Sequence, residues 1–144
     1  MRMKFPKLCA VTAVAASALT STLIGMETAH ADPMGVWLAE DGGRIRVNSC
    51  GGTALCGTIV TPKAWGPTTD SNNPDPALRG RPLIGVAVLI SMRPDGPAKW
   101  SGQLYNTDNS QTYDGHLRQI NGQTIRVEGC VIGICGGRNL TRVQ

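Results

Sequence analysis

The sequence predicts an all-β protein, an antiparallel up-and-down barrel of eight strands. Its 144 residues include 18 glycines and nine prolines, which disfavour long helices. From residue 35 onward, short runs alternate between apolar and polar residues, and Gly-, Pro-, Asn- and Asp-rich turns separate them. Closing such a sheet into a barrel removes its exposed edges, and a two-sheet sandwich is the alternative.

Residues 1–31 are predicted to be a signal peptide, and residues 32–144 a single domain. A basic start precedes an apolar, alanine-rich stretch at 8–25, and Ala-His-Ala at 29–31 provides a cleavage pattern. A membrane anchor is the alternative, but the stretch contains Ser and Thr and is shorter than the ~20 apolar residues that span a bilayer. We therefore expect cleavage after Ala31, no membrane span, and a periplasmic or secreted protein.

The charge of the chain gives no indication of a nucleic-acid partner. The formal net charge is +4, and three of the basic residues, Arg2, Lys4 and Lys7, lie in the predicted leader. No basic run follows them, whereas nucleic-acid-binding domains carry clustered Lys and Arg.

The first three strands are predicted at 35–40, 44–50 and 55–65. The turn Asp-Gly-Gly follows the first strand. The second alternates cleanly, so that Ile45 and Val47 share one face while arginines share the other.

The fourth strand, predicted at 83–93, is apolar on both faces, so its outer face should be covered. The long segment 66–82 could fold back over it, or a second subunit could, which makes a homodimer through the fourth strand a candidate. Within the segment we expect one helical turn, with Asn73 as N-cap and Pro74 at the first position. The segment is interpreted as a lid over one barrel mouth or as a packed connector.

The last four strands are predicted at 99–107, 112–120, 124–133 and 138–144. Asn121-Gly122 separates two of them and is the strongest two-residue hairpin signal in the chain.

Four cysteines remain once Cys9 is assigned to the leader. In an oxidising compartment they predict two disulfides, for which three connectivities exist. We favour the local pairs Cys50–Cys56 and Cys130–Cys135, each worth roughly 2–2.5 kcal/mol in the chain-entropy model. Their spacings fit zinc poorly, and no C-x-x-C occurs. Regulatory redox chemistry is the remaining alternative, and no metal or cofactor is predicted.

The barrel interior is the predicted binding site, for a small apolar or amphipathic ligand. Glycines predicted to face inward (Gly57, Gly102 and Gly115) would leave room for a cavity, and a completely filled core is the alternative. By alternation, the predicted ligand-binding residues are Trp37, Ile45, Val47, Ile59, Val88, Trp100, Leu104, Tyr113, Leu117, Ile125 and Val127; Ile90 is also expected inside.

Three residues flank the predicted lid at the barrel mouth: Trp65, Arg79 and Arg81. They could contact an anionic head group. Alternatively, they are solvated or paired with Asp70 and Asp75.

Catalytic motifs are weak, and we predict that the protein is not an enzyme. By alternation, His116 and Asp114 share the strand face that points outward. No G-x-S-x-G elbow provides a nucleophile. Asp70, Asn72 and Asp75 resemble a fragment of a calcium loop, but turn and N-cap chemistry explains them.

Several motifs together resemble a bacterial exported family, domain of unknown function 2147. They are GVWLAEDGGRIRVNSCGG, ALCGTIV, NPDPALRGRPLIG, KWSGQLYN, TYDGHLR and TRV. The resemblance implies a lipocalin-like (calycin) barrel in the periplasm that binds a small ligand. Gly35-x-Trp37 is similar to the lipocalin G-x-W signature, which implies that Arg142 covers the tryptophan. Leu140 stands where the family tends to carry tryptophan.

The leading hypothesis is therefore a periplasmic barrel that binds a small molecule without transforming it. The rival is an exported protein-interaction or inhibitor module. It would act through an exposed apolar surface around residues 86–92.

Overall fold

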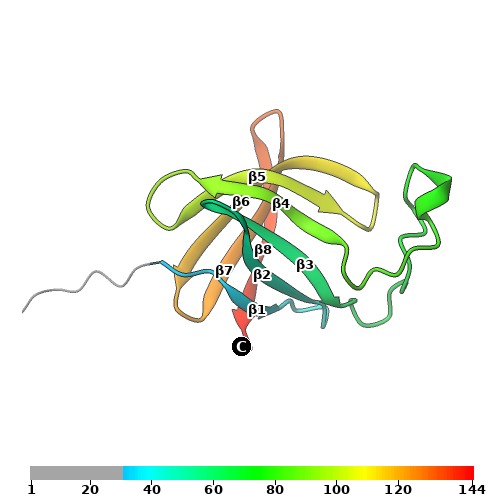
Figure 1. Cartoon of the computed structure of the whole chain (residues 1–144), viewed down its shortest axis with the longest axis horizontal. Helices are drawn as coiled ribbons and strands as arrows, with labels where there is room; N and C mark the ends of the chain where they lie inside the picture. Colours follow the sequence, from blue (N-terminus) through cyan, green and yellow to red (C-terminus); the bar gives the residue numbers. More distant parts are fainter. Residues whose placement is uncertain (1–30) are drawn as a thin grey trace, which may run out of the picture.

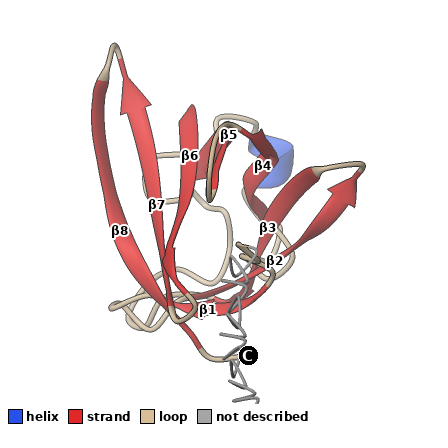
Figure 2. Cartoon of the chain, turned by 90° about the vertical axis from the view of Figure 1, so that its left-hand side faces the viewer, coloured by secondary structure: helices blue, strands red, loops and turns tan. Residues whose placement is uncertain are grey.

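The computed structural model describes residues 31–144, which form a closed barrel of eight antiparallel strands in sequence order (Figures 1 and 2). The predicted barrel is therefore confirmed, and the sandwich alternative is wrong. The elements are β1 (Gly35–Leu38), β2 (Arg44–Gly51), β3 (Ala54–Thr61), η1 (Pro76–Leu78), β4 (Ala87–Pro94), β5 (Lys99–Asn106), β6 (Gln111–Asn121), β7 (Thr124–Val131) and β8 (Ile134–Arg142).

The predicted signal peptide falls on residues 1–30 and Ala31, almost entirely outside the described residues, so the leader and the domain limit stay predictions. Across residues 31–144, no helix has the length and apolar character needed to cross a membrane.

The barrel closes where β1 meets the end of β8. Trp37 pairs with Arg142 in the antiparallel register. The guanidinium of Arg142 also lies over the Trp37 ring, 4.2 Å from its centroid, which is the contact that the resemblance implies. Gly35 has φ +133°, and a Cβ there would collide with the carbonyl oxygen of Gln144. The glycine of the G-x-W pattern therefore lets the C-terminus approach β1 closely.

The main core fills the end of the barrel near Trp37. Its buried side chains come from nearly every strand, so the interior at this end is solid. They are Trp37, Ala39, Val47, Leu55, Leu89, Met92, Leu117, Ile125, Val127 and Leu140.

Both predicted local disulfides are present, Cys50–Cys56 and Cys130–Cys135, and each joins the two strands of one hairpin. In the β7–β8 hairpin, Ile132 and Gly133 have φ 49° and 75°, as a type I′ turn requires. Because the chain reverses there, β8 begins at Ile134, four residues before the predicted start.

The β6–β7 hairpin forms at the predicted place, but its two turn residues are Gly122 and Gln123. Asn121 therefore ends β6 and does not occupy the turn itself. Its side-chain oxygen accepts a hydrogen bond from the backbone N–H of Gln123 at 2.8 Å.

Simple alternation is wrong in β4, where Leu89 and Met92 are buried and Ile90 is not. Two buried residues three apart require an irregular strand, and Ser91 has φ 50°. The register with β3 and β5 shifts at the same place, as it does at a β-bulge. β4 also begins at Ala87, because the preceding residues form a turn.

Residues 83–86, predicted to belong to the fourth strand, instead precede it and fold along β3. Leu83 and Val86 are buried in a second apolar cluster with Ile59, against which Val88 and Tyr105 pack. The exposed apolar surface expected at 86–92 is therefore wrong: Val86, Leu89 and Met92 are buried.

The segment between β3 and β4 is anchored by a buried carboxylate. Asp70 is 1% exposed and accepts hydrogen bonds from Tyr105 at 2.8 Å, Asn73 at 2.8 Å and Arg81 at 2.7 Å. Partial desolvation raises the pKa of Asp70, but these hydrogen bonds and the Arg81 charge outweigh it and lower the pKa below 3.8.

The predicted helical turn exists as η1, but it begins two residues later than expected. Asp75 is the N-cap and accepts from the backbone N–H of Ala77 at 2.9 Å, with Pro76 at the first position. Asn73 does not cap η1: its side-chain nitrogen donates to Asp70 and Tyr105, and its side-chain oxygen accepts from the backbone N–H of Asp75, before η1 begins.

Candidate functional site

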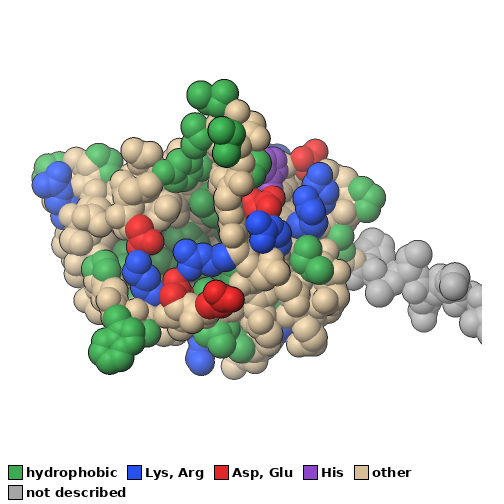
Figure 3. Space-filling model, turned by 180° about the vertical axis from the view of Figure 1, so that it is seen from behind, with side chains coloured by type: hydrophobic (Ala, Val, Ile, Leu, Met, Phe, Trp, Pro, Cys, Tyr) green, Lys and Arg blue, Asp and Glu red, His purple; other side chains and the backbone are tan. Residues whose placement is uncertain are grey.

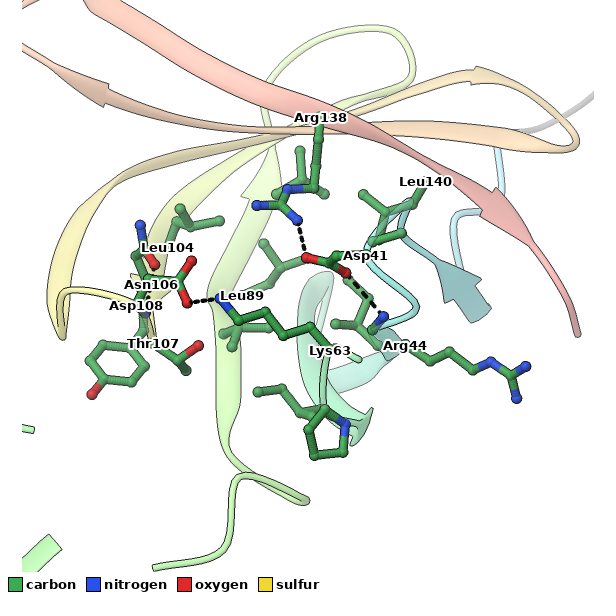
Figure 4. Close-up of a pocket in the computed structure, with 18 of the residues that line it drawn as sticks. Asp41, Arg44, Lys63, Leu89, Leu104, Asn106, Thr107, Asp108, Arg138 and Leu140 are labelled. Atoms are coloured by element: carbon green, nitrogen blue, oxygen red, sulfur yellow. Dashed lines mark hydrogen bonds and ion pairs between the residues drawn. The ribbon is translucent and has the colours of Figure 1, made fainter. Parts of the chain in front are cut away.

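A cavity of about 370 Å³ occupies the other end of the barrel (Figure 4). In an up-and-down barrel, the β1–β2, β3–β4 and β5–β6 connections lie at one end. Residues of all three connections line the cavity: Asp41, Lys63 and Asp108. The loop after β5 and the segment that carries η1 reach this end on the right in Figure 1.

The walls of the cavity are largely apolar. Five residues of the predicted ligand-binding set line it: Ile45, Ile59, Val88, Leu104 and Val127. Sequence reasoning missed the three leucines Leu83, Leu89 and Leu140, which also line the cavity.

The rest of the predicted set lies elsewhere, because the interior is divided into a filled end and a hollow end. Tyr113 lines a smaller hollow of about 210 Å³ beside Leu104 and Val131. The others belong to the filled core or pack against it: Trp37, Val47, Trp100, Leu117 and Ile125.

The predicted interior glycines allow close packing and do not create the cavity. A Cβ at Gly57 would lie 2.9 Å from the Leu89 side chain, and one at Gly102 would lie 2.6 Å from the carbonyl oxygen of Ile90. Gly115 is similarly close to Leu104. Other glycines line the hollow: Gly43, Gly129, Gly136 and Gly137.

Two ion pairs cross the mouth of the cavity (Figure 4). Arg138 of β8 contacts Asp41 at 2.5 Å, and Lys63 contacts Asp108 of the β5–β6 loop. Partial burial alone would raise the pKa of Asp41. The hydrogen bond from the Gly43 N–H and the charge of Arg138 outweigh this effect, so the pKa lies below its usual value of 3.8 and Asp41 is a carboxylate near neutral pH.

Arg44 of β2 also lies at the mouth, but its side chain is exposed and points away from the two ion pairs (Figure 4). The mouth therefore offers two cationic groups and two carboxylates above an apolar interior. Asp41, Lys63 and Asp108 lie in the connections between strands, where alternation gives no signal. Only Arg138, two residues before the inward Leu140, could have been found by alternation.

The residues predicted to form a lid do not line the cavity. Trp65 is fully exposed, Arg79 donates to the backbone oxygen of Asn73, and Arg81 is paired with Asp70. The alternative pairing of Arg81 with Asp70 is thus the arrangement present. From this segment, Pro67 reaches the cavity instead.

His116 lies outside the cavity, on the outer face of β6, and its Nδ1 is 3.0 Å from the Ser101 hydroxyl oxygen. The Ser101 hydroxyl donates its proton to Asp95 at 2.5 Å. A Ser-His-Asp triad requires the serine proton to face the histidine, so this arrangement does not activate a nucleophile.

A family model described as an uncharacterized protein conserved in bacteria (DUF2147) matches residues 35–142, which include all eight strands. The chain belongs to the DUF2147 family. A comparison with curated proteins finds no match for this DUF2147 chain.

One solved structure has the same fold as this DUF2147 protein. It is protein HP1028 from the human pathogen Helicobacter pylori, described as belonging to the lipocalin family. The two chains are 16% identical, with a TM-score of 0.69, and the match covers 78% of this chain and 84% of that one. The lipocalin-like fold of the DUF2147 chain is thus confirmed.

Proposed function

We propose that this DUF2147 protein is an exported, single-domain carrier that binds a small apolar or amphipathic molecule in its barrel without transforming it. The observation that carries the proposal is the cavity of about 370 Å³, with apolar walls and a charged mouth. Its volume falls within the roughly 300–1,000 Å³ of small-molecule sites.

The polarity of the cavity suggests how a ligand would lie. An apolar tail would contact Leu89, Leu104 and Leu140, while an anionic head group would lie among the mouth cations Lys63 and Arg138. Both cations are already paired with carboxylates and are partly exposed. Exposed ion pairs contribute only about 0–1 kcal/mol, so a ligand could replace them at small cost.

Export is supported by the two disulfides, which are typical of proteins in an oxidising compartment outside the cytoplasm. We propose that the leader 1–31 is removed and that the domain 32–144 functions in the periplasm or as a secreted protein.

Filling the cavity is expected to abolish ligand binding while the barrel still folds. In Ile59→Trp, the larger ring would enter the hollow from β3, where Ile59 is 8% exposed and lines the cavity. The fluorescence of an anionic naphthalene sulfonate probe should rise with wild-type protein, and the probe affinity of Ile59→Trp should fall at least about tenfold, a loss of about 1.4 kcal/mol.

Ile120→Trp adds the same ring to an exposed position and serves as the control, with unchanged affinity expected. Thermal unfolding of all three proteins would show that the barrel persists. Equal probe affinity in Ile59→Trp and wild type would contradict binding inside the barrel.

A second candidate function, interaction with another protein, is favoured by a different observation. The β7–β8 hairpin projects from the barrel (top of Figure 1), and hydrophobic side chains gather along it in Figure 3. At its tip, Val131, Ile132 and Ile134 are 51%, 96% and 80% exposed. Both edges of β4 are paired within the barrel, so this tip is a better candidate for a homodimer contact than the fourth strand.

If two copies associate through the tip, Ile132→Asp/Ile134→Asp should convert a dimer to a monomer, because burial of a charge opposes the contact. Sedimentation equilibrium of the wild type and the double variant would measure this. A Trp65→Asp variant, which adds a charge at another exposed apolar residue, should leave the mass unchanged. A monomeric wild type would exclude self-association at the concentrations tested.

A further inference from the structure

The second disulfide lies beside His116 on the outside of the barrel. Cys130 of β7 pairs with Cys135 of β8 and with Asp114 of β6, and His116 lies two residues along from Asp114. A nitrogen of His116 and the two Sγ atoms all lie within 4.8 Å of one another. This group leaves no signal in the sequence, because its members meet only when β6, β7 and β8 pair.

His116 is also oriented by a hydrogen-bonded chain. Since Ser101 donates its single proton to Asp95, its oxygen can only accept from Nδ1–H of His116. The proton is then on Nδ1, and Nε2 keeps its lone pair. Histidines that bind metals are commonly held in this way, with the other ring nitrogen donating to a polar group.

We propose that the reduced form of this disulfide, together with His116, is a binding site for a thiophilic transition-metal ion such as Zn²⁺. Two cysteine thiolates and one imidazole nitrogen are a ligand set of zinc sites, and the fourth position would be open to water. Cys130 is buried and Cys135 is exposed, so an ion could approach from the hairpin side.

The proposed metal site and the Cys130–Cys135 disulfide cannot exist at the same time, because both use the same two sulfur atoms. A dithiol reductant reduces the S–S bond to two thiols, supplies two electrons and two protons, and becomes a cyclic disulfide itself. When the ion binds, the two thiols lose their protons to solvent and two metal–sulfur bonds form. The hairpin would therefore hold metal only when reducing equivalents are present.

The first disulfide provides an internal comparison. Among the described residues, no third metal-ligating side chain joins Cys50 and Cys56 in such a group. The two pairs have similar sequence separations, six and five residues. A difference in metal affinity between them would therefore reflect His116.

The test uses the full chain with Cys9→Ser, Cys50→Ser and Cys56→Ser, which leaves only the proposed pair. A phosphine reductant, which becomes a phosphine oxide by taking oxygen from water, reduces the bond without supplying competing thiols. Co²⁺ then serves as the probe, and we expect a sulfur-to-cobalt absorption band at one ion per chain. The untreated, oxidised protein should show no band.

Adding Ser101→Ala should weaken Co²⁺ binding by about 10- to 100-fold, because the histidine loses its orienting partner. His116→Ala should weaken it at least as much. The chain with Cys9→Ser, Cys130→Ser and Cys135→Ser keeps the first pair and should bind no more tightly than the His116→Ala variant.

Equal affinity with and without His116 would overturn the proposal, as would the absence of a band after reduction. Circular dichroism would follow the fold throughout. If reduction loosens the hairpin, Zn²⁺ should restore the spectrum and raise the melting temperature of the reduced form only. Failure to do so would also overturn the proposal, while leaving the probe-binding test of the cavity unaffected.

Discussion

Replacing Asp70 with alanine is expected to lower the free energy of unfolding by about 3 kcal/mol, because this buried carboxylate accepts several charge-assisted hydrogen bonds. The loss would leave Arg81 without its carboxylate and would remove the acceptor of Tyr105 and Asn73. Urea unfolding would measure the change. Asp75→Ala is the matched control: it removes a nearby exposed carboxylate that only caps η1, at a cost of about 1 kcal/mol.

The contribution of Asp70 should also depend on pH. Its folded-state pKa is lowered from 3.8, so its stabilisation is fully present above that value and is lost as the pH falls through the folded-state pKa. The stability difference between wild type and Asp70→Ala should therefore be constant near neutral pH and shrink in acid. A difference that stays unchanged down to low pH would contradict the assignment of a charged Asp70.

Trp37→Ala should destabilise the barrel by a comparable amount, about 3–5 kcal/mol. The side chain is fully buried in the closed end, its Nε1–H donates to the Pro33 oxygen at 2.8 Å, and Arg142 stacks on its ring. Removal would leave a void where β1 and β8 meet. Thermal and urea unfolding would both report the loss.

The matched control is Trp65→Ala, since this tryptophan is completely exposed. Its free energy of unfolding should stay within about 0.5 kcal/mol of wild type. A small effect of Trp37→Ala would mean that the filled end of the barrel contributes little to the free energy of unfolding.

The fold could be predicted because its signals are local and repeated. Alternation in β2 placed Ile45 and Val47 on the inner face, and turn residues marked most hairpins. The cysteine spacings favoured local pairs, which the structure contains. Each of these inferences needs only neighbouring residues, so none depends on the register between distant strands.

The candidate site was less accessible to the same reasoning. The bulge at Ser91 moves Leu89 to the interior, and a change of backbone conformation at one residue leaves no alternating signal. The charged mouth groups Lys63 and Asp108 come from irregular segments that meet only in the folded barrel. The division between the filled and hollow ends likewise depends on which side chains meet across the barrel.

The two sulfur bridges have a consequence for how the chain matures. Beyond residue 31, each cysteine is joined to the next one along the chain, Cys50 to Cys56 and Cys130 to Cys135. If such a polypeptide is oxidised progressively from its N-terminal side, each thiol reaches its native partner by bonding to the next cysteine that becomes available. Its biogenesis would therefore need an oxidant but no enzyme that reshuffles mispaired sulfurs.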